Sequence, residues 1–286
     1  MTQSLLKFSK MHGLGNDFVV IDAISQVFDP TPQMVRAIGD RHFGVGFDQM
    51  LIVRKAESND HDFRYVIYNC DGSEVENCGN GVRCFARFVV EQGLIDGPVI
   101  RVETAAGSMR LELIDGQQVR VDMGAPTFAP SSLPFLADNA AITHQIEVDS
   151  GSIELSAIAT GNPHAVLLVD NVAEADVKQV GSQIQQHRSF PKSVNVGFLE
   201  VVDLHRGKLR VYERGVGETQ ACGTGACAAA VAGIRRGVLK SPVTLSLLGG
   251  DLTLEWAEGE SIIMTGPASH VFDGTLDLNY FSVANS

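Results

Sequence analysis

The feature that most limits how this chain can fold is an internal repeat. The run GSEVENCGNGVRC around Cys78 returns as GETQACGTGAC around Cys222, at an offset of 222 − 78 = 144 residues in a chain of 286. Two other matches keep the same order: GNDFVV at 15–20 with GNPHAV at 161–166, and VGF at 45–47 with VGF at 196–198. Because small shifts in offset are what loop-length changes produce, the chain is predicted to hold two copies of one fold.

Each copy is predicted to be rich in strands and to hold one main helix. Apolar residues recur at helical spacing over 80–91 and 224–236, and Gly93 and Gly237 follow as C-terminal stop signals. Strands are expected near 18–22, 49–54, 64–68, 99–104, 108–114 and 118–122, and again near 154–159, 165–169, 197–202, 208–212, 243–247, 251–256 and 261–265.

These patterns predict an α+β fold with two pseudo-symmetric domains, each strand-rich around one central helix. A Pro-dense stretch beginning at Gly124 is expected to link them. The N-terminal repeat domain, 1–124, would carry Cys78, and the C-terminal repeat domain, 125–267, would carry Cys222. The tail, 268–286, is expected to pack back on the first domain.

The charge composition of the chain limits which classes of binding partner are expected. The formal net charge is −12 and the Lys and Arg residues form no run, so neither nucleic acid nor a membrane is an expected partner. The N-terminus lacks signal-peptide features, and no apolar run reaches membrane-spanning length. The expected location is the cytoplasm, where the five cysteines should be reduced.

Cys78 and Cys222 each lie just ahead of a predicted helix, in a glycine-containing turn. A helix N-terminus offers unpaired N–H groups and a positive dipole end, which should favour the thiolate and lower the cysteine pKa. The same N–H groups can hold a carboxylate. With the two helix starts facing one carboxylate, one thiolate could remove an α-proton while the other thiol delivers a proton to the opposite face. The pattern therefore predicts inversion of a stereocentre without a cofactor, on a small amino-acid substrate.

The other three cysteines are expected to be structural. Cys84 and Cys227 lie six and five residues past the paired cysteines, which turns them away from the first helical turn, so they are predicted to be core residues. Cys70, at a strand-to-turn junction, is also expected to pack.

Metal and nucleotide sites are not predicted. There is no C-x-x-C pair and no His-rich tract, so structural zinc is disfavoured. Neither Gly-rich turn has a P-loop lysine, and no G-x-G-x-x-G opens a helix after a strand.

Longer motifs resemble the diaminopimelate epimerase family. They are NCDGSEVENCGNGVR at 69–83, KMHGLGNDF at 10–18, GNPH at 161–164, VNVGF at 194–198, YERG at 212–215 and ACGTGA at 221–226. The resemblance spans almost the whole chain. It implies a two-domain fold, a homodimer, and pyridoxal-phosphate-independent interconversion of LL- and meso-2,6-diaminopimelate on the bacterial route to lysine and peptidoglycan.

The resemblance also implies roles for individual residues. Cys78 would be the general base in one direction and Cys222 the acid, with the roles swapped in reverse, and His164 and Glu213 would steer the reacting amino group. The implied substrate contacts are Gly79 with Asn80 and Gly223 with Thr224 at the reacting carboxylate, and Asn16, Gln49, Asn69, Asn162, Asn195, Glu213 and Arg214 elsewhere. A substrate with two amino-acid ends needs charge partners at both, and Arg214 suits the distal carboxylate. Two positions depart from the family pattern: Cys70 stands where Ala is common, and Phe272 where Tyr is familiar.

The sequence leaves three alternative functions open. A proline or hydroxyproline racemase of the same fold would share the two-cysteine chemistry but needs no partner for a distal carboxylate. A redox-sensing, ligand-binding protein could use the same thiols. A cysteine peptidase could pair a thiol with His164, although this leaves the duplicated cysteine unexplained.

Overall fold

The computed structural model describes residues 5–75, 79–105, 107–137, 139–149 and 151–283. The chain divides into two compact units. The first unit comprises Met1–Val121 together with Gly266–Ser286, and the second comprises Asp122–Thr265.

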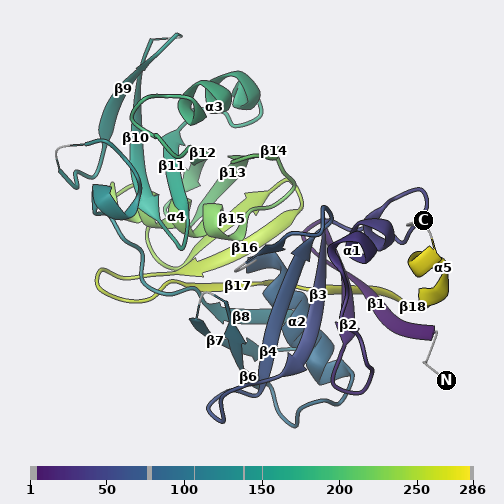
Figure 1. The fold of residues 1–286 in the computed structure, drawn as a ribbon. Helices are drawn as coiled ribbons and strands as arrows, with labels where there is room; N and C mark the ends of the chain where they lie inside the picture. The colour runs from purple at the N-terminus through teal and green to yellow at the C-terminus, as the bar shows by residue number, and fades with distance from the viewer. Residues whose placement is uncertain (1–4, 76–78, 106, 138, 150, 284–286) are drawn as a thin grey trace. The chain divides into compact units, whose positions relative to one another are not determined.

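The first unit consists mainly of strands, and the first two along the chain, β1 and β2, pair antiparallel (Figure 1). Its elements are β1 (Leu5–Gly13), β2 (Asn16–Asp22), α1 (Pro32–Gly39), β3 (Gln49–Lys55), β4 (Phe63–Asn69), β5 (Glu74–Val75), α2 (Gly79–Glu91), β6 (Val99–Thr104), β7 (Gly107–Leu113), β8 (Gln118–Asp122), β18 (Ser269–Asp277) and α5 (Leu278–Val283). The pairs β2–β3 and β4–β6 are parallel. The pairs β3–β4, β4–β5, β6–β7 and β7–β8 are antiparallel.

The second unit repeats this pairing scheme strand for strand. Its elements are η1 (Pro130–Ser132), β9 (His144–Val148), β10 (Gly151–Ala159), β11 (Pro163–Leu168), α3 (Val177–Gln185), β12 (Asn195–Asp203), β13 (Arg206–Glu213), β14 (Gly217–Glu218), α4 (Gly223–Arg235), β15 (Val243–Leu247), β16 (Gly250–Glu255) and β17 (Ile263–Pro267). The pairs β11–β12 and β13–β15 are parallel. The pairs β10–β11, β12–β13, β13–β14, β15–β16 and β16–β17 are antiparallel.

The C-terminal strand completes the first copy of the repeat. β18 pairs antiparallel with β1, as β9 pairs antiparallel with β10 in the second unit. In Figure 1 the yellow C-terminal strand accordingly lies beside the purple N-terminal strand. In the first unit the place next to the first strand is thus filled by β18, from the C-terminal end of the chain. In the second unit the same place is filled by β9, which directly precedes β10.

Each unit encloses one helix. In α4 every residue from Gly225 to Gly233 is buried, and in α2 every residue from Gly79 to Ala86 is buried. A helix that is apolar on all sides belongs inside a fold, and α4 packs against β10–β13, β15 and β16. Small residues permit this enclosure, since a Cβ on Gly81 would collide with the Tyr65 hydroxyl. The predicted α+β fold with a central helix in each half is therefore confirmed.

The helices α1, α3 and α5 and the short 3-10 helix η1 were not predicted from the sequence. α1 begins after Thr31, whose hydroxyl accepts from the Met34 N–H, and has Pro32 in its first turn; α3 begins after Asp176, whose carboxylate caps the Gln179 N–H. Both starts carry a recognisable capping residue. α1 and α3 are short, at 8 and 9 residues, which is less than the about 11 to 18 residues over which a helical pattern is read from a sequence.

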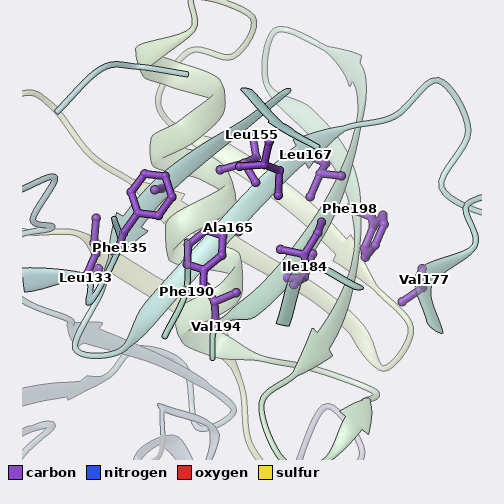
Figure 2. Close-up of a cluster of buried hydrophobic side chains, with 14 of the residues drawn as sticks. Leu133, Phe135, Leu155, Ala165, Leu167, Val177, Ile184, Phe190, Val194 and Phe198 are labelled. Carbon is purple, nitrogen blue, oxygen red and sulfur yellow. The ribbon is translucent and has the colours of Figure 1, made fainter. Parts of the chain in front are cut away.

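Helix α3 covers one face of the second unit's strands. Its Ile184 belongs to a buried apolar cluster with Leu167 of β11 and Phe198 of β12, shown in Figure 2. Leu133 and Phe135 join the same cluster. The Pro-dense stretch beginning at Gly124 is therefore packed where it nears its end, and Thr127 bridges to the strand β10. Among the described residues, no helix is long and apolar enough to cross a membrane.

Candidate active site

Cys222 is the N-cap of α4. Its Sγ accepts a hydrogen bond from the Gly225 N–H at 3.3 Å and lies 3.6 Å from the Thr224 Oγ1. The residue has an extended backbone, with φ −125° and ψ 107°, so the helix starts directly after the sulfur. The side chain is 5% exposed. The reactive atom thus lies at the positive end of a buried helix.

Glu213, the last residue of β13, is close enough to the Cys222 thiol for its charge to act on that thiol. Its Oε1 also accepts a 2.5 Å hydrogen bond from the Thr219 hydroxyl. Burial raises the pKa of Glu213, and the hydrogen bonds from Thr219 and Cys222 partly offset that rise. The Thr219 hydroxyl consequently holds the carboxylate close to the thiol.

The predicted lowering of the cysteine pKa is wrong for Cys222. Burial raises the pKa of this thiol well above its usual value, and the negative charge of Glu213 raises it further. The hydrogen bonds from Thr224 and Gly225 act in the expected direction but are outweighed. Desolvation wins because a thiolate loses more hydration than one helix end returns. Cys222 therefore rests as a thiol.

His164 lies in β11 and is 1% exposed. Its Nε2 is 2.8 Å from the Asn162 Oδ1, so the ring donates to this amide in its neutral form. Burial, together with the charge of Arg214, lowers the pKa of His164 to about 3. The imidazole is uncharged at neutral pH and serves as a polar but neutral wall of the site.

Asn195, at the start of β12, connects the remaining polar residues. Its Nδ2 donates to the Pro163 carbonyl at 3.1 Å, and its Oδ1 accepts from the Arg214 N–H at 2.9 Å. The two strands β11 and β12 place His164 opposite Asn195 in register. The guanidinium of Arg214 is exposed and donates to the Lys192 carbonyl at 3.2 Å. We call Asn162, His164, Asn195, Glu213, Arg214, Cys222, Gly223 and Thr224 the second half-site.

The buried neutral His164 should make stability depend on pH. Its pKa is depressed in the folded state, so between pH 6.5 and about 3 the unfolded chain binds a proton that the folded chain does not. This contribution is complete above pH 6.5 and is lost as the pH falls. From pH 7.5 to pH 5 the wild type should lose about 2 kcal/mol more unfolding free energy than His164→Gln. Urea denaturation at both pH values measures the difference, and equal losses in the two proteins would contradict it.

The first unit contributes its own set of amides. Asn16, at the start of β2, accepts a 3.3 Å hydrogen bond on its Oδ1 from the Nδ2 of Asn80, in the first turn of α2. Gln49 of β3 donates to the Asn69 Oδ1 at 3.0 Å, and Asn69 donates to the Ser73 hydroxyl at 3.1 Å. Together with Gly79, which opens α2, Asn16, Gln49, Asn69 and Asn80 form what we call the first half-site. Cys78 lies outside the described residues.

The two half-sites occupy equivalent places in the repeat. Asn16 and Asn162 adjoin the first strands of the parallel pairs, β2 and β11; Gln49 and Asn195 start β3 and β12; Asn69 and Glu213 end β4 and β13; and Asn80 and Thr224 lie in the first turns of α2 and α4. The sequence-predicted residues thus gather into one cluster per unit. The chemistry differs between the clusters, since the only carboxylate among these positions is Glu213.

None of the cysteines in the described part of the chain forms a disulfide. Cys84 and Cys227 are fully buried, as predicted. The expectation that Cys70 packs is wrong, because its side chain is exposed at the turn after β4. Within the described parts of the chain, no group of three or more His, Cys, Asp or Glu side chains could hold a metal ion.

Three residues that hold site side chains in place were not predicted from the sequence: Thr219, Asp48 and Arg83. Thr219 and Arg83 lie inside the motifs around the paired cysteines, whereas Asp48 directly precedes Gln49. Each acts by holding another polar side chain. Nothing in a residue's type reveals such a partner, so only the tertiary contacts identify them.

A family model for diaminopimelate epimerase matches residues 8–129 and 156–271 of this chain. The chain belongs to the diaminopimelate epimerase family. Members with this name from Ectopseudomonas mendocina (strain ymp) and Pseudomonas aeruginosa (strain UCBPP-PA14) are each 56% identical over 275 residues, which is 96% of this chain and 100% of theirs.

Solved structures show that the fold of the diaminopimelate epimerase family extends further. A hydroxyproline epimerase from Agrobacterium vitis, with bound trans-4-hydroxy-L-proline, matches with a TM-score of 0.68 and 18% identity, over 96% of this chain and 93% of that one. A PhzF-family protein from Bacillus anthracis matches with a TM-score of 0.66 and 17% identity, over 95% and 99%. At such identities the likeness concerns the fold alone, so the proline-type rival gains no support beyond a shared architecture.

Proposed function

We propose that this protein is a diaminopimelate epimerase, an isomerase that interconverts LL- and meso-2,6-diaminopimelate on the route to lysine and peptidoglycan. Moving one α-proton between Cys78 and Cys222 would invert the carbon with no cofactor. The names of relatives that are 56% identical over their full length support the substrate. The two-domain repeat, with residues 1–124 and 268–286 in one domain and 125–267 in the other, would provide one cysteine each.

The observation that carries the proposal is the pairing of Cys222 with Glu213 at the start of α4. A buried thiol with a raised pKa rests protonated, which is the state that a proton donor requires. Glu213 lies near the thiol and could accept a hydrogen bond from an α-ammonium group. An ammonium there would offset the carboxylate charge that raises the pKa of Cys222, so substrate binding would ease release of the proton.

The proton transfer can be written with all electrons assigned. The Cys78 thiolate takes the α-proton, and the C–H electron pair stays on the carbon and delocalises into the adjacent carboxylate. Cys222 then gives its proton to the opposite face of that carbon and becomes a thiolate, held by the Gly225 N–H and by Thr224. In the reverse direction the two cysteines exchange roles.

Helix starts would stabilise the charge that develops on the reacting carboxylate. The first N–H groups of a helix have no partner inside it. Those of Gly223 and Thr224 at α4, and of Gly79 and Asn80 at α2, would therefore donate to this carboxylate.

The other site residues would bind the two ends of the substrate. His164 and Glu213 would steer the reacting amino group, with His164 acting as a neutral ring. Arg214, whose guanidinium is exposed, suits the distal carboxylate through a charge-assisted fork. The amides of Asn16, Gln49, Asn69, Asn162 and Asn195 would supply the remaining contacts.

We further propose that the enzyme works in the cytoplasm as a homodimer. The described cysteines form no disulfide, which suits a reducing compartment. The dimer rests on the family resemblance, and light scattering of the purified protein would measure it.

The function is tested by following the α-hydrogen of LL-diaminopimelate in deuterated water. We expect deuterium to enter the α-position and meso-diaminopimelate to accumulate, as measured by NMR and chiral chromatography. L-proline and trans-4-hydroxy-L-proline, tested at the same concentration, should show no exchange. Exchange with either of these but not with LL-diaminopimelate would instead show that the protein is a proline or hydroxyproline racemase. If the folded protein exchanges the α-hydrogen of none of the three compounds, the result would favour the alternative of a redox-sensing, ligand-binding protein.

A further inference from the structure

In the first half-site, the amides of Asn16 and Asn80 belong to a chain of directed hydrogen bonds. The Nδ2 of Asn16 donates to the Asp48 Oδ2 at 2.8 Å, and the Nδ2 of Asn80 donates to the Asn16 Oδ1 at 3.3 Å. The Asn80 Oδ1 accepts from the Arg83 Nη2 at 3.1 Å. The chain thus runs from a guanidinium, through two amides, to a carboxylate.

The two ends of this chain set its direction. A carboxylate only accepts hydrogen bonds and a guanidinium only donates them, whereas an amide can turn over and exchange its oxygen for its NH₂ group with little change in shape. With Asp48 at one end and Arg83 at the other, only one orientation of each amide satisfies every bond. Replacing Asp48 by a neutral group would remove the constraint at its end.

Asp48 is itself anchored by charged neighbours. Its Oδ1 accepts from the Arg41 Nη2 at 2.9 Å, and its Oδ2 also accepts from the Asp17 N–H at 3.1 Å. Arg41 forms a two-pronged pair with Asp17, which also accepts from Lys10. Burial opposes ionisation of Asp17, but the hydrogen bonds from Arg41 and Lys10 outweigh it and lower its pKa to about 2. Asp17 therefore stays ionised across the neutral range and keeps Arg41 in place beside Asp48.

The second unit forms the same fold without these groups. In the two equivalent parallel strand pairs Phe18 faces Gln49 and His164 faces Asn195, so Val194 stands at the place of Asp48. The sequence match of VGF at 45–47 with VGF at 196–198 is therefore not kept in the structure. At the 144-residue offset, Cys227 stands at the place of Arg83. The equivalent strands and helix form all the same. The amide chain is therefore not a requirement of the fold, and its presence in one unit alone points to a role at the site.

We propose that Asp48 is a positioning residue that fixes the orientation of the Asn16 amide for substrate binding. The proposal rests on the proposed epimerase function, in which both amides contact the substrate. Asp48 would act at the level of binding, because it touches the amide and not the reacting carbon.

The variant that tests this is Asp48→Asn. The Asp48 side chain is 46% exposed, so the variant should fold. We expect KM for LL-diaminopimelate to rise about tenfold with kcat within about twofold, since a turned amide weakens ground-state and transition-state binding alike. The matched control is Asp62→Asn: Asp62 likewise accepts from an arginine, Arg101, and from a backbone N–H. That control removes a comparable ion pair elsewhere in the unit and should leave KM unchanged.

A double-mutant cycle separates positioning from a merely structural effect. If Asp48 acts through Asn16, Asp48→Asn should change kcat/KM no further once Asn16 is Ala. Losses that multiply in Asn16→Ala/Asp48→Asn, or an unchanged KM in folded Asp48→Asn, would overturn the proposal. A wild-type protein that does not epimerise LL-diaminopimelate would instead remove the proposed function, so the two failures are distinguishable.

Discussion

Replacing Cys222 by Ser is expected to reduce interconversion of LL- and meso-diaminopimelate by about a thousandfold or more in both directions. A serine hydroxyl is a far weaker acid than a thiol and cannot deliver or take the proton at a comparable rate. Ser is, however, a good N-cap, so it can replace the sulfur as acceptor for the Gly225 N–H. Activity should therefore fall while the unfolding free energy changes little. NMR-monitored epimerisation and urea denaturation measure the two effects.

Two other variants complete this test. Cys222→Ala should be equally inactive and also lose about 1 kcal/mol of stability, because the cap is gone. Cys70→Ala removes an exposed thiol outside both half-sites and should epimerise like the wild type. If Cys222→Ser retained a tenth of the wild-type kcat, the thiol would not be the proton carrier.

Replacing Glu213 by Gln should lower kcat/KM by about two orders of magnitude. The amide retains the size of the carboxyl group and can still accept from Thr219, but it has no charge to pair with the substrate ammonium. It also removes the negative charge that helps to raise the pKa of Cys222. The thiol of the variant should therefore ionise at lower pH, which moves the alkaline limb of the kcat/KM–pH profile to lower pH in the direction in which Cys222 is the proton donor.

The control for this variant is Glu200→Gln in the neighbouring strand β12. Glu200 pairs with Lys208 and accepts from the Val172 N–H, so the change removes a hydrogen-bonded carboxylate outside the half-site. We expect its activity to stay within about twofold of the wild type. Equal activities in Glu213→Gln and Glu200→Gln would exclude a role for the Glu213 charge.

The strands and helices that the sequence predicted correctly are those whose apolar residues recur with a clear period over the whole element. Strands at 99–104, 118–122 and 243–247 match β6, β8 and β15, and the two main helices begin one residue earlier than expected. β1 and β9 were missed because their pairing partners, β18 and β10, decide their conformation. Strand formation depends on a neighbour that a local window does not contain.

The candidate site was predictable as a set of residues but not as an electrostatic environment. The helical spacing of apolar residues over 224–236 placed Cys222 at a helix start, and the structure agrees. The sign of its pKa shift was predicted wrongly, because the helix dipole can be read from a motif whereas burial and the approach of Glu213 cannot. His164 gave no sign in the sequence of a pKa near 3, since complete burial in β11 causes it.

The sequence by itself determined the duplicated architecture, the pairing of Cys78 with Cys222 by a 144-residue offset, and membership of the family. These are properties of residue order, and two copies of a pattern in register order are legible without coordinates. Only the tertiary structure decided which state the Cys222 thiol rests in, and that Asp48 and Arg83 direct the amides of the first half-site. Desolvation and hydrogen-bond direction depend on which atoms surround a group, and segments far apart in the chain supply those atoms.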